Sequence, residues 1–377
     1  MDDNRNQHQL PKRVVVCGGG IVGVSTAYFL AKKGAAVTLI ERSSIAGAAS
    51  GKAGGFLARH MCDGGPLSSL AHASFNLHRS LAEELDGSRS YGYRPLTAVT
   101  VSVKETESPS KSPVLPPWVD GGVESGEIIG TTETTAQIHP RLFTRALLTK
   151  AVAEYGVRVV IGKVESVAVE GEGVVVKVEK GGDVGGDAVV LALGPWTSKL
   201  PELSSRFRVY GKKVHSVVLE PKDDGDVITP HALFATYYPT HGASPIDPEV
   251  YPRPTGEVYI CGPSVEAEIP DGPDLVFPDR ESTQLLKKVA GMISSRLKEG
   301  NVRTKTEQAC YMPCTDDELP IMGVVPGMKQ CYVASGHGCW GILFGPATGA
   351  AMAELVLDGH SSIIDLNCFS PARFLRA

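Results

Sequence analysis

Hydrophobic positions near the start of the chain follow the order strand, turn, helix, strand. Residues 13–41 contain the apolar run RVVVC, the glycine-rich turn GGGIVG, a segment with apolar residues at helical spacing, and the apolar run AVTLIE. This order within about 30 residues is typical of a βαβ unit with parallel strands. Gly34 follows the helical segment, at a position where glycine commonly ends a helix.

A second group of such elements is predicted in the middle of the chain. A helix is expected over 143–155, followed by a strand at 157–161. Alternating apolar residues at 164–180 predict a hairpin, and the run DAVVLALG at 187–194 predicts a buried strand. Close to the end of the chain, CYVASG predicts a strand and PATGAAMAELVL predicts a helix.

The remaining segments have the short alternating runs of an antiparallel sheet. These include TAVTVSV, VHSVVLE and EVYICG, and a single helix is expected over 282–298. The predicted fold class is therefore α/β, with a discontinuous Rossmann-like domain and a second α+β domain built on an antiparallel sheet. The expected boundaries are 12–85, 139–208 and 300–377 for the first domain, 86–138 and 209–299 for the second, and 1–11 for a flexible N-terminus.

Composition and charge exclude several classes of function. With 42% hydrophobic and 21% charged residues in 377, the chain has the balance of a folded protein. The net charge of -5, without a cluster of Lys and Arg, argues against a nucleic-acid partner. We expect no membrane span, because 18 consecutive apolar residues do not occur. Without a signal-like apolar stretch at the start, and with eight scattered cysteines, we expect a cytoplasmic protein with reduced thiols and no metal site.

The glycine-rich turn satisfies the G-x-G-x-x-G pattern at Gly18, Gly20 and Gly23. The first glycine permits the tight turn, the second lets the backbone approach a pyrophosphate, and the third lets helix and strand pack closely. Amide groups at the start of the helix, around Ile21 and Val22, would face the phosphates. These residues predict a dinucleotide site, with a glycine turn that binds no ligand as the alternative.

An acidic residue completes the dinucleotide pattern. Glu41 ends the second predicted strand, where a carboxylate can accept hydrogen bonds from the adenosine ribose. An acid there disfavours the ribose phosphate of NADP, although Arg42 beside it leaves some room for one. At this point FAD and NAD are both open.

Three later segments resemble the D-amino-acid oxidase superfamily of flavoproteins, especially its glycine oxidase and sarcosine oxidase branch. They are AASGKAGGF at 48–56, DAVVLALGPW at 187–196 and SGHGCWGILFGPATGAAMAEL at 335–355. The resemblance implies FAD as cofactor and a Rossmann-like domain of the glutathione-reductase type. It also implies further cofactor-binding positions, namely Ser50, Gly51, Lys52, Gly54, Gly55, Val164, Gly194, Trp196, Gly336, His337, Gly338 and Gly341.

Those positions make physical sense around a flat ring. Glycines at 51, 54 and 55 would let the backbone approach the flavin where a Cβ would clash. The turn from Gly336 to Gly341 leads into the final helix, whose positive end would stabilise negative charge on reduced flavin. Val164 lies where members of the family contact the adenine through backbone groups. The alternatives are that the turn from Gly336 to Gly341 is purely structural and that Val164 is an ordinary core residue.

In this family an amine or amino acid loses a hydride equivalent from the carbon beside nitrogen, which gives an imine. The resemblance therefore implies oxidation of the C–N bond of a small or secondary amine or amino-acid derivative, with O2 as acceptor and hydrogen peroxide as product. Sarcosine oxidases use a lysine to promote the reaction with oxygen, but Ile260 stands at the aligned position. Lys52 and His337 are the catalytic candidates in its place, although Lys52 could instead bind flavin carbonyls.

Two positions near residue 310 distinguish branches of the family. Cys310 aligns with the cysteine that bonds covalently to the flavin in monomeric sarcosine oxidases, and a buried free thiol is the alternative. Met312 stands where glycine oxidases have the arginine that pairs with the substrate carboxylate. Arg253 could take over that role, or it could be a structural residue. Tyr237, Tyr238 and Trp340 are the other candidates for the wall of the substrate pocket, with ordinary core packing as the alternative.

Two further functions stay open on the sequence. The missing arginine and the long Ser/Pro loop at 106–117 give some weight to a flavin-binding protein with little turnover, used as an interaction module in trafficking or assembly. The glycine motif by itself is also compatible with an NAD-dependent dehydrogenase.

Overall fold

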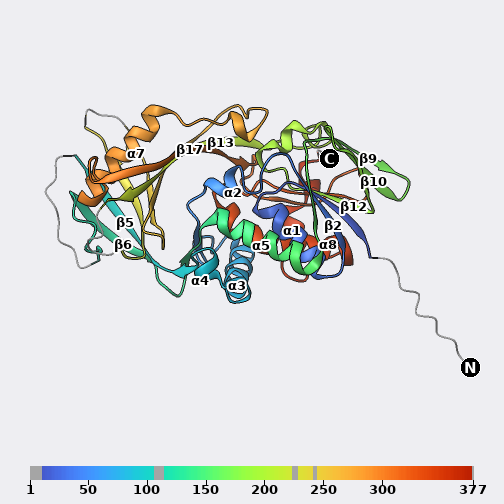
Figure 1. Ribbon diagram of the computed structural model, residues 1–377, viewed down its shortest axis with the longest axis horizontal. Helices are drawn as coiled ribbons and strands as arrows, with labels where there is room; N and C mark the ends of the chain where they lie inside the picture. Colours follow the sequence, from blue (N-terminus) through green and yellow to red (C-terminus); the bar gives the residue numbers. More distant parts are fainter. Residues whose placement is uncertain (1–10, 106–113, 223–227, 241–243, 376–377) are drawn as a thin grey trace, which may run out of the picture.

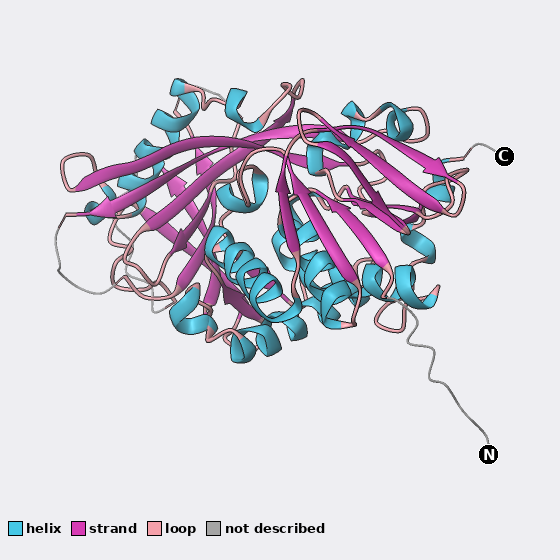
Figure 2. Ribbon diagram, turned by 45° about the vertical axis from the view of Figure 1, so that its right-hand side comes forward, coloured by secondary structure: helices cyan, strands magenta, loops and turns pink. Residues whose placement is uncertain are grey.

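Two β-sheets of different kinds organise the computed structural model, which describes residues 11–105, 114–222, 228–240 and 244–375. The two sheets lie toward opposite ends of the long axis of the molecule, and helices cluster along one side (Figures 1 and 2). The predicted flexible segment at the N-terminus lies almost entirely outside the described residues. The predicted fold class is confirmed, because one sheet is mainly parallel and the other mainly antiparallel.

The mainly parallel sheet has six strands. Its five parallel strands run in the order β19, β12, β1, β2, β8, and β18 pairs antiparallel with β19 at one edge. The bounds are β18 (Ile321–Val324), β19 (Cys331–Ser335), β12 (Ala188–Leu191), β1 (Arg13–Cys17), β2 (Ala36–Glu41) and β8 (Arg158–Ile161).

Side chains of β1 alternate between two cores, one on each face of this sheet. Val14 and Val16 pack on the helices α1 (Ile21–Lys32), α3 (Ser68–Glu84), α5 (Pro140–Tyr155) and α8 (Gly341–Asp358). Val15 and Cys17 pack on the antiparallel sheet of β9 (Val164–Glu170), β10 (Gly173–Val178) and β11 (Gly182–Gly186). Burial on both faces explains why this strand is an unbroken apolar run.

The mainly antiparallel sheet has seven strands, and only the β14–β5 pair is parallel. Helix α7 (Arg280–Ile293) covers one face, where Leu286, Val289 and Ile293 pack against the strands. In order across the sheet, the strands are β17 (Val302–Cys314), β13 (Tyr210–Pro221), β16 (Val258–Glu266), β15 (Glu249–Pro252), β14 (His231–Tyr238), β5 (Thr97–Lys104) and β6 (Val123–Gly130).

Short elements connect the two large sheets. A small sheet joins β7 (Thr135–Gln137) to β3 (Phe56–Ala58) and β4 (Arg94–Pro95). The other short segments are α2 (Ala49–Lys52), α4 (Gly87–Ser90), α6 (Pro201–Ser204), η1 (Gly194–Lys199), η2 (Pro273–Leu275), η3 (Ser295–Leu297), η4 (Gly338–Trp340), η5 (Asn367–Phe369) and η6 (Pro371–Phe374).

One predicted domain boundary is wrong. The sequence assigned everything after residue 300 to the parallel-sheet domain, but β17 pairs with β13 from Cys314 to Val302 inside the seven-stranded sheet. The predicted helix at 282–298 also ends earlier, at Ile293. Helix α3 was not predicted at all, although its buried residues Leu70, Phe75, His78 and Leu81 lie close to helical spacing.

Helix α8 is the most apolar helix of the core. Together with the turn before it, the segment Gly338–Asp358 is long and apolar enough to cross a membrane, but 72% of an apolar 18-residue stretch within it is buried inside the protein. It packs between α1 and α3. An apolar surface on all sides is what a helix in this position requires, and the absence of a membrane span stays a prediction.

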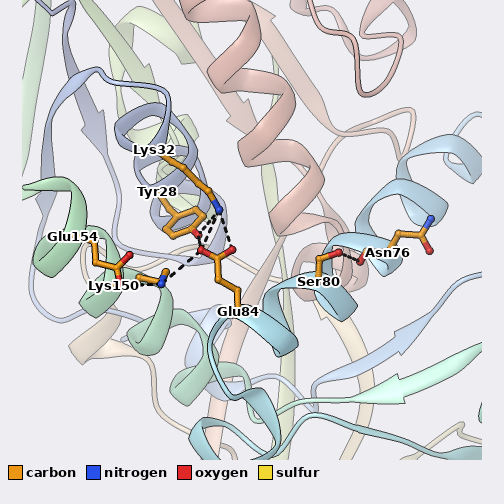
Figure 3. A network of polar contacts seen from close by, with 7 residues as sticks. All are labelled: Tyr28, Lys32, Asn76, Ser80, Glu84, Lys150 and Glu154. Atoms are coloured by element: carbon orange, nitrogen blue, oxygen red, sulfur yellow. Dashed lines mark hydrogen bonds and ion pairs between the residues drawn. The ribbon is translucent and has the colours of Figure 1, made fainter.

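A polar network ties three of these helices together where α3 ends (Figure 3). The carboxylate of Glu84 accepts a hydrogen bond from the Tyr28 hydroxyl at 2.5 Å and is 2.9 Å from the Lys32 ammonium, both on α1. Lys150 of α5 lies 3.7 Å from the same carboxylate. Burial would raise the pKa of Glu84, but these bonds outweigh burial and lower it.

We predict that Glu84→Gln lowers the free energy of unfolding by about 1–3 kcal/mol, because the two ammonium groups and the buried Tyr28 hydroxyl lose their charged acceptor. A carboxylate whose pKa is lowered by folding stabilises the folded state at pH values above the pKa that it has in the unfolded chain. It loses this contribution as the pH falls through its pKa in the folded state. The difference between the variant and the parent protein should therefore shrink below about pH 4. Urea unfolding at pH 7 and pH 3 measures this difference, and an equal difference at both pH values would contradict the role of Glu84.

Candidate functional site

A cavity of about 510 Å³ lies at the carboxyl ends of the parallel strands. Turns that follow β1, β2, β12 and β19 form one wall, and residues of β14, β15, β16 and β17 form the opposite wall. In open α/β sheets, ligands bind at this edge. The two large sheets therefore enclose one common site.

The glycine turn after β1 makes close backbone contact with the turn after β12. Gly18 has a φ of 116°, and a Cβ on it would lie 2.2 Å from the carbonyl oxygen of Ala192, so only glycine fits. Gly23 lies against the carbonyl of Gly18 in the same way. The amide of Ile21, at the start of α1, donates to Ser50 Oγ at 2.9 Å, which links this turn to the second glycine segment.

The acidic residue at the end of β2 lines the cavity beside the turn. Glu41 Oε2 accepts from the amide of Gly19 at 2.7 Å, and Oε1 accepts from the amide of Ser43 at 2.9 Å. Arg42 and Val164 line the same part of the cavity. The carboxylate is thus held in one orientation next to the amides that begin α1.

Farther along the cavity, the second glycine segment meets the seven-stranded sheet. A Cβ on Gly54 would lie 2.3 Å from the ring of Tyr251 and 3.0 Å from that of Tyr259. The turn at 336–341 lies on the same cavity, where Trp196 is held by a hydrogen bond from its Nε1 to the carbonyl of Pro270 at 2.8 Å. Strand, turn and loop segments that are far apart in sequence converge here.

Most of the sequence-predicted residues lie on this one cavity. Those that line it are Gly18, Gly20, Ile21, Val22, Glu41, Arg42, Ser50, Gly54, Gly55, Val164, Gly194, Trp196, Cys310, Met312, His337, Gly338, Trp340 and Gly341. Within the described part of the chain, its lining does not include Gly23, Gly51, Lys52, Gly336, Tyr237, Tyr238 or Arg253. Gly51 and Gly336 instead pack closely on Ala46 and Thr315.

His337 lies in a buried part of the cavity lining, where a positive charge is disfavoured. Its Nε2 lies 3.0 Å from Thr348 Oγ1, and burial lowers the pKa of the imidazole to about 3. Burial therefore disfavours the charged imidazole, and a catalytic role of His337 stays a prediction.

Lys52 contacts β17 close to Cys310, which lines the cavity. Lys52 Nζ donates to the carbonyl of Ala309 at 2.9 Å, and burial lowers the pKa of this ammonium. Cys310 faces the cavity, and burial raises the pKa of its thiol to about 11, although the nearby Lys52 acts in the opposite direction. A role of Lys52 with oxygen stays a prediction.

Three predicted substrate residues lie elsewhere. The Tyr237 hydroxyl donates to Glu105 within the core under α7, and Tyr238 is 42% exposed. Arg253 is buried with its Nη1 3.4 Å from Glu257 Oε2, so its charge is already paired. None of these three residues lines the cavity in the described part of the chain, and a role for them with the substrate stays a prediction.

Strands β14, β15 and β16 present residues to the cavity that no sequence motif indicated. The members of this group are Phe234, Glu249, Tyr251, Tyr259 and Cys261, together with Phe56 of the small sheet. Register brings them together, because Glu249 pairs with both Phe234 and Cys261, and Tyr251 pairs with Tyr259. The alternation of E-V-Y and Y-I-C is the signal that could have indicated a shared face.

Comparisons with known proteins agree with this geometry. Residues 13–355 match a family described as FAD-dependent oxidoreductases. The chain belongs to this family. An oxidoreductase of Schizosaccharomyces pombe is 31% identical over 96% of this chain and 98% of its own length, and the glycine oxidase of Bacillus subtilis is 26% identical over 91% and 92%. The glycine oxidase structure from Geobacillus kaustophilus has a TM-score of 0.81 at 22% identity, over 97% of this chain and 100% of that one.

The resemblance to the D-amino-acid oxidase superfamily is thereby confirmed, and the protein is an FAD-dependent oxidoreductase. The residues present fit FAD. The turn at Gly18 leaves no room for a side chain, the first residues of α1, Ile21 and Val22, line the cavity, and the Glu41 carboxylate is fixed beside the turn. Gly54 and the turn at 336–341 line the continuation of the same cavity.

We predict that Glu41→Ala weakens FAD binding about 10-fold or more, since a hydrogen bond to a charged group is worth about 1.5–3 kcal/mol. The matched control is Glu165→Ala, which removes an exposed carboxylate from β9, outside the cavity lining. Dissociation constants for FAD test this, measured by fluorescence on apoprotein reloaded with the cofactor, with Cys310→Ala present in both variants so that the cofactor can be removed. Equal FAD affinity in both variants would mean that Glu41 stabilises the glycine turn but does not contribute to FAD binding.

Proposed function

We propose that this FAD-dependent oxidoreductase oxidises the C–N bond of a small primary or secondary amine, or of an amino-acid derivative, to an imine. In this reaction the amine and O2 give the imine and hydrogen peroxide. The observation that carries the proposal is a single cavity lined both by the dinucleotide turns and by an aromatic face of the seven-stranded sheet. The glycine oxidases among the similar proteins support it.

Bound FAD would supply the acceptor for the hydride equivalent. The chain would bind and orient the amine against Gly54 and the turn at 336–341, and its aromatic wall would keep water away. Phe56, Phe234 and Tyr251 form that wall, with ring centroids 5.1 to 6.0 Å apart. Such surroundings lower the pKa of an amine, which favours the uncharged form that can be oxidised.

The main experiment is an anaerobic screen of amines and amino acids on the yellow protein. We expect at least one amine to bleach the flavin absorption, and we expect air to restore the colour with release of hydrogen peroxide. Stable colour with every amine and amino acid would instead favour a flavin-binding protein with little turnover. Colourless protein that stays so with excess FAD would contradict both flavin functions.

We also propose that Cys310 bonds covalently to the flavin, because its thiol lines the cavity and lies in the aligned position. The raised pKa of this thiol makes the thiolate scarce at neutral pH, but the neighbouring Lys52 acts in the opposite direction. Acid precipitation should leave a yellow pellet, and Cys310→Ala should transfer the colour to the supernatant. Cys261→Ala is the matched control, since that buried thiol lines the cavity from another strand. Free flavin released from the parent protein would contradict covalent attachment.

A further inference from the structure

We propose that the carboxyl group of Glu249 binds the amine nitrogen of the substrate, and that the substrate is an amine with an apolar or aromatic substituent and no carboxylate. This inference rests on the proposed function, because it assigns the substrate class of the same cavity. Four features of the wall formed by β14, β15 and β16 support it.

The first feature is an unused oxygen atom on the cavity. Glu249 Oε2 accepts from the Tyr251 hydroxyl at 2.5 Å and from the Cys261 thiol at 3.7 Å. Oε1 accepts no hydrogen bond from any residue in the described part of the chain. Since Glu249 lines the cavity, Oε1 is available to accept a hydrogen bond from a ligand bound there.

The second feature is the sign of the charge on this wall. Among described residues, the cations that line the cavity are Arg42 after β2, Lys163 before β9 and Lys199 in η1, all on segments of the parallel-sheet side. The seven-stranded sheet contributes one charged residue to the lining, the acid Glu249. An amine thus finds a partner of opposite charge there, whereas a carboxylate does not.

The third feature is that the nearby candidates for a carboxylate partner are already engaged. Arg253 pairs with Glu257, and Lys52 donates to the carbonyl of Ala309. Met312 lines the cavity but offers no positive charge. A buried carboxylate without a partner is costly, so an α-amino acid would bind this wall poorly.

The fourth feature is the apolar surface beside Glu249. Phe234 pairs with Glu249 in the sheet, and the Tyr251 ring stacks on Phe56 at 5.6 Å and on Tyr259 at 6.1 Å. These rings provide contact area for an apolar substituent on the carbon beside nitrogen. They also attract an ammonium group through their faces.

Glu249 would act as a catalytic residue because it takes one proton from the bound ammonium. The proton moves from nitrogen to Oε1, so the pair changes from ammonium and carboxylate to amine and carboxylic acid without any change in net charge. The lone pair on nitrogen becomes free at that moment. Burial raises the pKa of Glu249, which suits a carboxyl group that has to accept this proton.

The test uses benzylamine and phenylglycine, which share the phenyl group and the amine nitrogen and differ by a carboxylate. Dissociation constants come from anaerobic titrations of the FAD-loaded protein, followed by the flavin spectrum. We expect benzylamine to bind at least 10-fold more tightly than phenylglycine. Equal or tighter binding of phenylglycine, or no binding of benzylamine, would overturn the inference.

The variant Glu249→Gln keeps the shape of the side chain but removes its charge. We expect it to weaken benzylamine binding 10-fold or more and to narrow the difference from phenylglycine. Glu220→Gln on β13 is the matched control, because Glu220 pairs with Arg303, outside the cavity lining, and this variant should bind both compounds as the parent does. Unchanged benzylamine affinity in Glu249→Gln would contradict the proposal that Glu249 binds the amine nitrogen.

The pH dependence of the parent protein gives a second measurement that needs no variant. Affinity for benzylamine should fall with decreasing pH as Glu249 becomes protonated, with a midpoint above about 4.3, the ordinary glutamate pKa. The other groups facing Glu249 do not titrate there: burial raises the pKa of Tyr251, Cys261 and Cys339, and it lowers that of His337 to about 3. If the affinity for benzylamine stays constant down to pH 4, the role of Glu249 as the binding group is contradicted.

The two proposals fail in different ways. Tight benzylamine binding that depends on Glu249, without bleaching by any amine, would contradict amine oxidation and leave the binding assignment intact. Bleaching by benzylamine at equal rates in the parent protein and in Glu249→Gln would leave amine oxidation intact and contradict Glu249 as its binding group.

Discussion

Direct contact between two backbone turns is the constraint on which the rest of the structure depends. The turn after β1 packs on the turn after β12 so closely that Gly18 has no space for a Cβ beside the carbonyl of Ala192. This contact sets where α1 begins, and Ser50 then holds the amide of Ile21 and brings the second glycine segment to the same place. The cavity is therefore built from backbone positions that the parallel sheet holds rigidly.

The two sheets are coupled by β17 as well as by the cavity that they share. This strand pairs along β13 in the seven-stranded sheet and also contacts α2, where Gln308 donates to the carbonyl of Lys52 at 3.0 Å and Lys52 donates back to Ala309 at 2.9 Å. Cys310 and Met312 follow on the cavity side of the same strand. A displacement of the seven-stranded sheet would thus move the wall of the cavity and the glycine segment together.

The dinucleotide half of the site could be predicted from sequence because its chemistry is local. A strand, three glycines, a helix and an acid at the end of the next strand act within one βαβ unit, so their spacing along the chain corresponds to their arrangement in space. The substrate half depends on the pairing of β14, β15 and β16, which no short motif encodes. Glu249 was missed for that reason, and both alternatives for Arg253 stayed open because its buried partner Glu257 cannot be inferred from spacing alone.

The distribution of charge along the cavity follows from this division between the sheets. The cations lie with Glu41 on the side that would hold the phosphates, where a negative ligand needs them, and Glu249 is the one charged residue that the seven-stranded sheet adds to the lining. A cation near Glu249 would pair with it and remove the acceptor, just as Glu257 neutralises Arg253 a few residues away. Keeping Oε1 free therefore requires a wall of aromatic rings, thiols and a thioether around it, and that is the composition of the wall. The replacement of a cation by Met312 and the presence of an unpaired acid are, in this view, two parts of one preference for a positively charged substrate over a negatively charged one.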